Sequence, residues 1–569
     1  MTKLARMLLL TLALVAPCVA AAPLILLRSD TTEAFFRANG GRYDLLITPW
    51  REFFARQGLA ARELRAEELG AVNGPAILVL ASTVALADSE REAIRARIAA
   101  GWSVLGTWAS GVRDGRGEWA GYGFIDEVFG ATVEPELAAT KDESFLLPFG
   151  ETPLTQRLSA GKRIYLEPTP EPLLRVRARN AAARYGNWMR ETTQPGALLA
   201  AVAFDERVGA RRAYLGFAET SWIAARADLD SLLLGTLDWL GRKPLLAKAA
   251  WPYPHQAALL LEMDTEDKFE NSLRFATLLE RYRLRGTFYS VTSEAARFPQ
   301  VLKRLAARHE IAYHADVHDG FGKLAPARQD ARMKAMIKQM KNLLPDVRTA
   351  TGFRAPLEEY DATTERLLRA NGLRHHAASP GAREDVLPGF SSAEIGLPAD
   401  RALVVLPRTW LDDMNLRKSA RLEEEAAAKM VLSHLDDTVA MRGFGLLSIH
   451  TQQFYAGSAV ERATQRLLAE LPKYGALVWT APAESIVRWW REREAVAVSS
   501  QADAGRLRVT LNAARPVQAL QLVLIPPGSA EPRLEAPALD ARLEKLDAQR
   551  YAIVLPALPA GRSELSVLF

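Results

Sequence analysis

The chain has 569 residues, of which 49% are hydrophobic and 24% are charged, and this indicates a globular protein rather than a disordered one. The length exceeds what a single hydrophobic core usually supports, so we expect about two to four domains. The net charge of +5 comes from residues of both signs that are interspersed along the chain, without a long basic block. We therefore expect no nucleic-acid partner, despite an isoelectric point of about 9.1.

The N-terminal residues have the layout of a secretory signal peptide. Lys3 and Arg6 precede the apolar run 7–15, and small residues follow at 20–22. We expect residues 1–22 to be removed, which would give a periplasmic or secreted protein.

Two alternatives would instead tether the chain to a membrane. The uncharged stretch continues to Leu27, as in an uncleaved anchor, and Cys18 would suit a lipid anchor. Pro17 disfavours both alternatives, because it interrupts the apolar run and stands where lipoprotein signals usually carry Gly or Ala. We expect a membrane partner only if one of these alternatives holds.

Cys18 is also the only cysteine of the chain. Removal of the signal peptide would leave a protein without disulfides, without Cys-ligated zinc and without a Cys nucleophile. Any metal ion in the mature chain would then be held by histidines and carboxylates.

Residues 23–245 alternate between strand-like and helix-like segments. AILVLAS (76–82) is a continuous apolar run, as in a buried parallel strand. Ser89 and Glu92 then predict a capping box at the start of a helix, and WSVLGTW (102–108) predicts the next strand. This order of strand, helix and strand indicates a doubly wound α/β domain.

The first domain resembles the class I glutamine-amidotransferase-like or flavodoxin-like folds. SLLLGTLDWLG (231–241) is the pattern of an apolar helix in such a fold. A resemblance at the level of the fold does not imply an activity, and the mature chain would lack the Cys nucleophile of amidotransferases. We therefore interpret 23–245 as a non-catalytic module that contacts carbohydrate or packs against the next domain.

A change of composition marks the next boundary. RKPLLAKAAWPYPHQ (242–256) carries three prolines, and residues 250–493 then alternate strands with helices again. Residues 495–569 contain short strands between turn-forming residues and indicate a small β-sandwich-like domain. The predicted strands of this last domain are 506–513, 519–527, 550–558 and 562–569.

The histidines direct attention to the middle domain. His314 and His318 lie four residues apart in IAYHADVHDG (311–320), just after a predicted strand. Two such imidazoles can reach one opening if the loop turns after the strand, and neutral imidazole is a common zinc ligand. All eight histidines lie between residues 255 and 450, namely His255, His309, His314, His318, His375, His376, His434 and His450.

Other predicted strands of the middle domain also end in chemically capable residues. LLLEMDTEDKF (259–269) runs into Asp264, Glu266 and Asp267. Carboxylates at the C-terminal mouth of a buried strand are where α/β barrels place their chemistry. Three further segments carry such residues: Arg354 in GFRAP (352–356), Asp412 and Asp413 in TWLDD (409–413), and His450 in GLLSIHTQQ (445–453).

The order of these motifs resembles the polysaccharide deacetylases of the NodB-homology type, carbohydrate esterase family 4. The resemblance covers roughly residues 250–490. It implies a distorted (β/α) barrel of about seven strands for the middle domain. The matching segments are RHEIAYHADVH (308–318) for the histidine motif, GTFYSV (286–291), FRAP (353–356) for the Arg motif and SIH (448–450) for the last strand.

The resemblance also implies a role for each motif residue. The implied metal ligands are His314, His318 and one acid, Glu266 by preference or else Asp267. The implied catalytic residues are Asp264 as general base, Arg354 beside it, and His450 as general acid, with Asp412 or Asp413 holding the second nitrogen of His450; Asp412 is our first choice.

The chain departs from the family pattern at three places. Thr265 occupies the place of the family's second Asp and cannot act as an anionic ligand. Ala315 replaces the usual Ser or Thr after the first metal-binding His. Leu357 and Glu358 replace the aromatic residue and the Gly after the Arg motif, so the wall that faces the substrate differs from that of the family.

We therefore expect an exported, metal-dependent deacetylase that removes N-acetyl groups from a glycan, such as an exopolysaccharide, peptidoglycan or a chitin-like chain. Two imidazoles and one carboxylate suit zinc, and cobalt, nickel or manganese would also fit. One alternative is a catalytically silent glycan-binding protein that retains the barrel. Another is a metal amidohydrolase that acts on a non-sugar C–N bond.

The remaining residues of interest receive structural interpretations. We expect His375 and His376 to form a surface or strand-entry pair, and His434 to pack or face solvent on a helix. Trp489 and Trp490 are typical of a helix face in a core rather than of a sugar platform.

Overall fold

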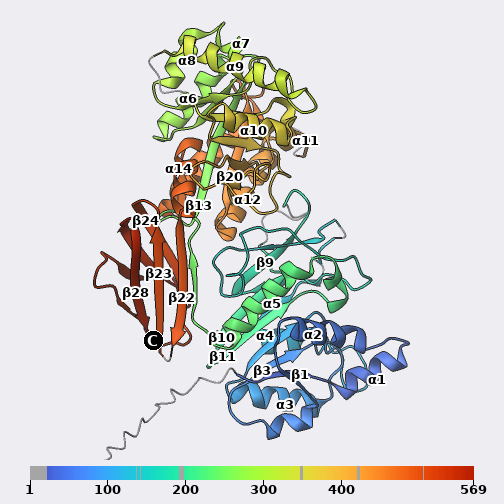
Figure 1. Cartoon of the computed structure of the whole chain (residues 1–569). Helices are drawn as coiled ribbons and strands as arrows, with labels where there is room; N and C mark the ends of the chain where they lie inside the picture. The colour runs from blue at the N-terminus through green and yellow to red at the C-terminus, as the bar shows by residue number, and fades with distance from the viewer. Residues whose placement is uncertain are drawn as a thin grey trace, which may run out of the picture.

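A computed structural model describes residues 22–135, 138–140, 142–190, 198–345, 350–419, 423–503 and 505–569. Residues 1–21, with the signal-peptide features and Cys18, lie outside the described residues, so cleavage and anchoring stay predictions. Among the helices that the structure describes, none combines the length and the apolar character needed to cross a membrane. Figure 1 shows an N-terminal sheet with helices, a middle α/β sheet above it and a C-terminal group of strands beside them.

The N-terminal sheet has nine strands in the order β2-β1-β3-β4-β11-β10-β9-β6-β7. The half from β2 to β11 is parallel, and the remaining strands pair antiparallel. Its strands are β1 (Leu24–Leu27), β2 (Ala61–Leu64), β3 (Ile77–Leu80), β4 (Ser103–Thr107), β6 (Phe145–Pro148), β7 (Ile164–Tyr165), β9 (Asn180–Gly186), β10 (Val202–Arg207) and β11 (Ala210–Leu215), and β5 (Ala131–Val133) pairs separately with β8 (Val176–Ala178).

Helices cover both faces of this sheet, which explains its continuous apolar strands. In β1, Leu24 and Leu26 pack with α2 and α5, whereas Ile25 and Leu27 face the side of α3 and α4. The helices are α1 (Asp30–Ala38), α2 (Asp44–Arg56), α3 (Asp88–Ala99), α4 (Gly123–Phe129) and α5 (Arg226–Leu240), with the 3₁₀ turns η1 (Ala66–Ala71) and η3 (Glu219–Ile223).

The predicted capping box at Ser89 and Glu92 is wrong in register. Helix α3 begins at Asp88, and the side chain of Glu90 accepts the backbone N–H of Ala87 at 2.8 Å. The same carboxylate also accepts a hydrogen bond from the Ser29 hydroxyl at 2.7 Å. This contact from 61 residues away, which local sequence cannot reveal, favours Glu90 over Glu92.

The C-terminal strands form two four-stranded sheets, β12-β24-β27-β26 and β22-β23-β28-β25. Apolar side chains from both sheets join one core, which also includes Trp489 and Trp490, each 5% exposed. The strands are β12 (Leu245–Lys248), β22 (Val496–Asp503), β23 (Arg506–Ala513), β24 (Val517–Ile525), β25 (Arg533–Glu535), β26 (Arg542–Lys545), β27 (Tyr551–Leu558) and β28 (Gly561–Leu568).

Strand β12 lies inside the segment 242–256 that we interpreted as a boundary. It pairs antiparallel with β24, from Leu245 opposite Ile525 to Lys248 opposite Leu522. The proline-rich segment therefore contributes an edge strand to the C-terminal sheets, which the composition alone did not indicate.

The middle sheet is curled, with the strand order β18-β19-β17-β16-β15-β14-β13-β20. The strands from β19 to β20 pair in parallel, and β18 is antiparallel at one edge. The strands are β13 (Ala257–Thr265), β14 (Thr287–Ser290), β15 (Glu310–Tyr313), β16 (Gly352–Arg354), β17 (His375–Ala378), β18 (Gly389–Phe390), β19 (Val404–Pro407), β20 (Phe444–His450) and β21 (Val478–Thr480), which pairs with β13.

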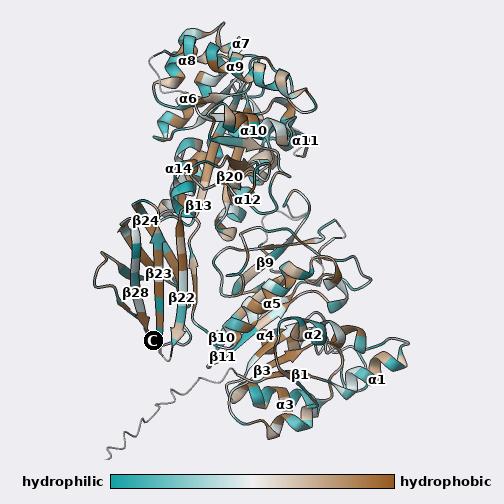
Figure 2. Ribbon diagram, viewed as in Figure 1, coloured by the Kyte–Doolittle hydropathy of each residue, from teal (hydrophilic) through white to brown (hydrophobic). Residues whose placement is uncertain are grey.

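Helices surround the outside of this sheet, and its central strands are strongly apolar (Figure 2). The helices are α6 (Asn271–Arg281), α7 (Thr292–Ala295), α8 (Pro299–Ala306), α9 (Pro326–Leu343), α10 (Ala362–Ala370), α11 (Asp413–Ser419), α12 (Glu424–Met441), α13 (Ala459–Glu470) and α14 (Ala483–Glu494), with the 3₁₀ turns η4 (Pro356–Glu358) and η5 (Leu471–Leu477).

The sheet forms a curled half-barrel, which is an open form of the distorted barrel of about seven strands that we expected. In the described part of the chain, β20 pairs with β13 but not with β19. The segment after β19 covers the open edge through side chains: the Thr409 hydroxyl donates to the carbonyl of Phe444 at 2.7 Å and accepts the N–H of Leu446 at 3.2 Å. In the described part of the chain, hydrogen bonds of the Thr409 side chain therefore connect this segment to β20 in place of backbone pairing between β19 and β20.

Candidate active site

The candidate site lies where the parallel strands β13, β15, β16 and β20 end. Parallel strands present their carboxyl ends at one edge, so residues distant in sequence meet there. The strands bring together two groups of potential metal-binding side chains. The first group is Glu266, His314 and His318, and the second is Asp264, Glu266 and His450.

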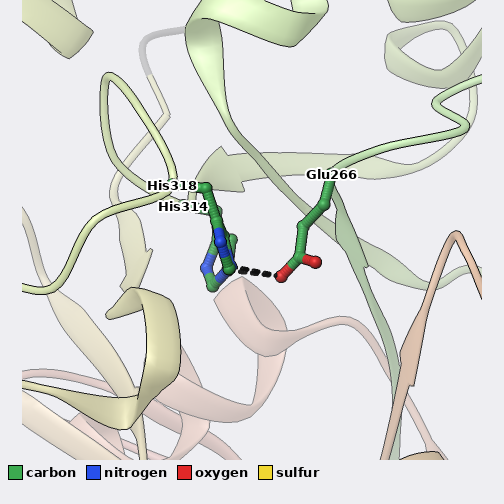
Figure 3. A group of neighbouring side chains, drawn as sticks. All are labelled: Glu266, His314 and His318. Carbon is green, nitrogen blue, oxygen red and sulfur yellow. Dashed lines mark hydrogen bonds and ion pairs between the residues drawn. The ribbon is translucent and has the colours of Figure 1, made fainter.

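Glu266 faces both imidazoles of the first group. Its Oε1 atom lies 3.1 Å from Nε2 of His314 and 2.7 Å from Nε2 of His318. Figure 3 shows the two rings one behind the other, with the Glu266 carboxylate directed at them from the opposite side. The three ligand atoms lie within 4.8 Å of one another, so a single ion could contact all of them.

The loop after β15 brings the two histidines together. Ala315 has a φ of 81°, in the left-handed region, and this reverses the chain directly after His314. Arg332 of α9 then anchors the loop: its guanidinium donates to the carboxylate of Asp316 and to three loop carbonyls, those of Val317, Asp319 and Gly320, at 2.8–3.0 Å.

Neighbouring groups orient the potential ligands. Nδ1 of His314 lies 3.0 Å from the carbonyl oxygen of Arg354, which can only accept, so this nitrogen carries the proton and Nε2 offers its lone pair. The Gln452 amide donates to Oε2 of Glu266 at 2.6 Å and leaves Oε1 for the histidines. This donor set fits a divalent ion, because it supplies two directed imidazole lone pairs and one carboxylate oxygen.

Asp264 is held by Arg354. The guanidinium Nε donates to Oδ2 of Asp264 at 2.8 Å, and both side chains are almost fully buried. Oδ1 of Asp264 has no hydrogen-bond partner among the described residues. One oxygen is therefore fixed, and the other is left to accept a proton or a hydrogen bond.

Arg354 also contacts two further acids that the sequence analysis missed. Its Nη1 lies 3.2 Å from Glu262, which is fully buried, and its Nη2 donates to Glu358 at 3.2 Å. Burial raises the pKa of Glu262 to about 8, against the opposing influence of Arg354. Alternation along β13 places residues 262 and 264 on the same face, and this signal could have identified Glu262.

His450 is paired with Asp413 and not with Asp412. Nδ1 of His450 lies 2.6 Å from Oδ1 of Asp413, and Oδ2 of Asp413 accepts the backbone N–H of His450 at 2.7 Å. Our first choice, Asp412, instead contacts Arg408 at 2.9 Å and accepts the backbone N–H of Asn415 at 2.7 Å. The two acids differ because Asp413 faces β20 while Asp412 caps the first turn of α11.

Asp413 also changes the acidity of His450. Burial would lower the pKa of His450, but the charge and hydrogen bond of Asp413 outweigh it, and the pKa rises to about 10. Nε2 of His450 lies 3.7 Å from Oδ2 of Asp264. A protonated imidazole and a carboxylate therefore border the same space.

The acid that lies beside the two histidines is Glu266 rather than Asp267. Asp267 is exposed and belongs to neither group of potential ligands. Thr265 points away from the site: its hydroxyl donates to the carbonyl of Tyr289 at 3.0 Å and lies 2.8 Å from the Ser290 hydroxyl, which can donate to it. Alternation along the strand explains why residues 264 and 266 reach the site and 265 does not.

The other histidines lie outside the site. His375 and His376 begin β17, as expected for a strand-entry pair, and both are fully buried, so a surface position is wrong for either. His434, on α12, stacks on Trp410 with ring centroids 5.9 Å apart, which agrees with a packing role. His309 faces Glu280 at 3.4 Å, and His255 stacks on Trp479.

Comparison with known proteins gives a family match in the middle sheet. Residues 258–376, about a fifth of the chain, match the family model of polysaccharide deacetylases, so this segment is a polysaccharide-deacetylase domain of a divergent kind. No curated protein matches the chain.

Solved structures match less than half of the chain. A protein described as a polysaccharide deacetylase from Pseudomonas aeruginosa PAO1 is 19% identical, with 42% of this chain and 93% of that chain covered and a TM-score of 0.37. A second from Mycobacterium smegmatis is 21% identical, with 43% and 94% covered and a TM-score of 0.35. A family 4 carbohydrate esterase described as a pseudoenzyme, from Bacillus anthracis, is 11% identical, with 41% and 66% covered and a TM-score of 0.30.

Proposed function

We propose that this chain is an exported, metal-dependent deacetylase that hydrolyses N-acetyl groups of a glycan. The observation that carries the proposal is the position of Glu266. Its carboxylate belongs to a metal-binding group with His314 and His318, and to a second group with Asp264 and His450. Potential ligands, base and acid thus surround one small space.

The residues divide the chemistry of amide hydrolysis between them. Asp264, held at Oδ2 by Arg354, would accept a proton from the attacking water at its free Oδ1. The hydroxyl oxygen would form a bond to the acetyl carbon. His450 would donate its Nε2 proton to the amide nitrogen as the C–N bond breaks, which yields acetate and a free amine.

Asp413 would keep His450 ready for this donation. It contacts Nδ1 and so directs the proton-bearing Nε2 toward the space beside Asp264. The imidazolium would also be favoured at neutral pH, because its pKa is raised to about 10. The Asp264 carboxylate, which can accept a proton, would therefore lie beside the His450 imidazolium, which can donate one.

Glu266, His314 and His318 would hold the ion. When bound, a divalent cation acidifies water and stabilises the negative charge that develops on the acetyl oxygen. Two imidazoles and one carboxylate favour zinc, and cobalt, nickel or manganese would also be accepted by these ligands.

Export and the glycan substrate rest on other features. The charged, apolar and small residues of 1–22 support secretion across a membrane. The polysaccharide-deacetylase match supports an acetylated glycan such as an exopolysaccharide, peptidoglycan or a chitin-like chain.

The test combines elemental analysis with acetate release. The purified mature chain should contain about one transition-metal ion, and the His314→Ala/His318→Ala variant should contain none. Wild type should release acetate from at least one of partially acetylated chitosan, peptidoglycan and N-acetylated exopolysaccharide.

The other outcomes identify the alternatives. Metal content without turnover on any acetylated glycan would favour a silent glycan-binding protein. Turnover confined to cyclic or linear non-sugar amides would favour an amidohydrolase. Absence of metal from wild type, even after reloading with zinc, cobalt and nickel, would overturn the enzyme assignment.

A further inference from the structure

A cavity lies away from the candidate active site, at the opposite end of the middle sheet. It has a volume of about 510 Å³ and is lined by residues that begin β15 and β17, together with the end of α9 and one side of α14. The lining of the cavity reaches along β15 from Glu310 to Tyr313, but none of Glu266, His314 and His318 belongs to it. The cavity is therefore separate from the metal-binding group.

A gap in the sheet explains the cavity. Strands β15 and β16 are neighbours, but among the described residues they pair only at Tyr313 and Phe353, near the ends that carry the candidate active site. Toward the other end the two strands separate, and Ile311 and Thr351 line the cavity instead of pairing across it. The opening gives access to side chains that would otherwise be enclosed within the curled sheet.

Cationic residues outnumber acidic ones in the lining of the cavity, with six Lys and Arg residues against four Asp and Glu residues. Lys341, Arg374 and Arg488 line it, are exposed, and form no ion pair with a described residue. Arg285 and Arg515 are paired with Glu484 and Asp400, at 3.4 and 3.7 Å. Such a cluster concentrates positive potential and favours an anion.

Two buried donors in the lining also lack a partner. Arg491 donates through Nη2 to the carbonyls of Arg374 and Ala402, but its buried Nε has no hydrogen-bond partner among the described residues. His375 is fully buried, and its Nδ1 likewise lacks a partner. Buried polar groups are nearly always hydrogen-bonded, so these two nitrogens are unsatisfied donors beside the cavity.

The neighbours of His375 indicate what its free nitrogen can do. The Tyr289 hydroxyl lies 3.2 Å from Nε2, and with this hydroxyl donating, the ring proton lies on Nδ1. Burial keeps the ring neutral by lowering its pKa to about 3. Gly352 makes room for the ring, because a Cβ atom there would lie 2.3 Å from Nε2.

The acidic residues of the cavity lining do not remove its preference for an anion. Glu310 is buried, and its Oε2 already accepts the Thr287 hydroxyl at 2.8 Å and the backbone N–H of Glu484 at 2.9 Å. Burial raises the pKa of Glu310 to about 7, so part of its population is neutral at pH 7. Glu492 is the remaining acid, and it lies beside Arg488 on α14.

We propose that this cavity is a second ligand-binding site, which takes a monosaccharide-sized organic anion that carries a phosphate or carboxylate group. Arginine guanidinium groups bind both kinds of oxyanion through paired hydrogen bonds. The volume lies within the usual range for small-molecule pockets. This site does not depend on the proposed deacetylase activity, because it shares no residue with the metal-binding group.

The test is titration calorimetry on the full mature chain with glucose 6-phosphate, glucuronate and neutral glucose. We expect at least one of the two anions to bind at one site per chain and glucose not to bind. Binding of glucose 6-phosphate alone would assign the site to phosphate esters, and binding of glucuronate alone would assign it to sugar acids. The same titration on the His314→Ala/His318→Ala variant should give the same affinity, which separates this site from any anion bound at the metal centre.

A charge variant links the binding to this cavity. Arg374→Gln/Arg488→Gln removes two exposed cations, and we expect affinity to fall about tenfold or more. The control is Arg62→Gln/Arg179→Gln, which removes two exposed arginines of the N-terminal domain and therefore has the same net charge as the cavity variant. The proposal is overturned if neither anion binds, if glucose binds equally well, or if the cavity variant and its control bind alike.

Discussion

Asp413 contacts His450 at two points: its Oδ1 lies 2.6 Å from the ring Nδ1, and its Oδ2 lies 2.7 Å from the backbone nitrogen. This double contact fixes the ring relative to its own strand, so the position of Nε2 is set by one side chain. A carboxylate that orients and charges an imidazole in this way suits a general acid.

Asp413→Asn should therefore lower kcat by about 100-fold or more while metal content stays unchanged. The matched control is Asp412→Asn, because Asp412 contacts Arg408 and caps α11 without touching His450. Asparagine is also a good cap, so this control should retain most of the activity. Equal losses in the two variants would contradict the assignment of Asp413.

The dependence of kcat on pH should also reflect the contact between Asp413 and His450. The pKa of His450 is raised to about 10, so the acid stays protonated, and kcat should persist until the pH approaches that value. The raised pKa also stabilises the fold fully below the ordinary value of 6.5, and this contribution is lost as pH rises through about 10. In Asp413→Asn, burial would dominate and the alkaline limb of kcat should move to lower pH. An unmoved limb would show that another group sets it.

Glu266 and Asp267 provide a second matched pair. Glu266→Gln should lose the metal ion, because the carboxylate faces both imidazoles, whereas the exposed Asp267 should tolerate Asn with normal metal content. Elemental analysis of both variants decides between them. Metal loss from Asp267→Asn alone would reverse the assignment.

Asp264→Asn tests the base. The amide keeps the shape of the side chain but has no carboxylate to accept a proton, so turnover should fall to near background and metal content should remain. His450→Ala should likewise lose rate and keep the ion. Wild-type rates in Asp264→Asn would refute the base assignment, and loss of metal from His450→Ala would make His450 a ligand.

Arg332 tests the loop that carries the second histidine. Arg332→Gln removes the hydrogen bonds to Asp316, Val317, Asp319 and Gly320, so metal affinity should fall about 10 to 100-fold. Excess metal should restore activity, since no catalytic group is lost. Arg328→Gln, on the same helix and exposed, is the control and should bind metal normally. Unchanged metal affinity in Arg332→Gln would show that the loop keeps its conformation without Arg332.

Much of the site follows from short-range pattern. A period of two along β13 assigns Asp264 and Glu266 to the same face and Thr265 to the other. The spacing of His314 and His318 predicts a shared opening once the loop turns, and the left-handed Ala315 provides that turn. The sequence could not decide between Asp412 and Asp413, because both lie at the start of one helix and only the course of β20 selects one of them.

The sequence alone determined the α/β character of the middle domain, the residue types of the candidate metal-binding group and the motif order that resembles polysaccharide deacetylases, because these depend on periodicity and on residues near in sequence. The tertiary structure decided the open half-barrel, the place of β12 in the C-terminal sheets, the Asp413–His450 pair and the cationic cavity behind the active site. Each of these depends on contacts between segments tens to hundreds of residues apart, and such contacts are set by how strands close, separate and pack rather than by any local pattern.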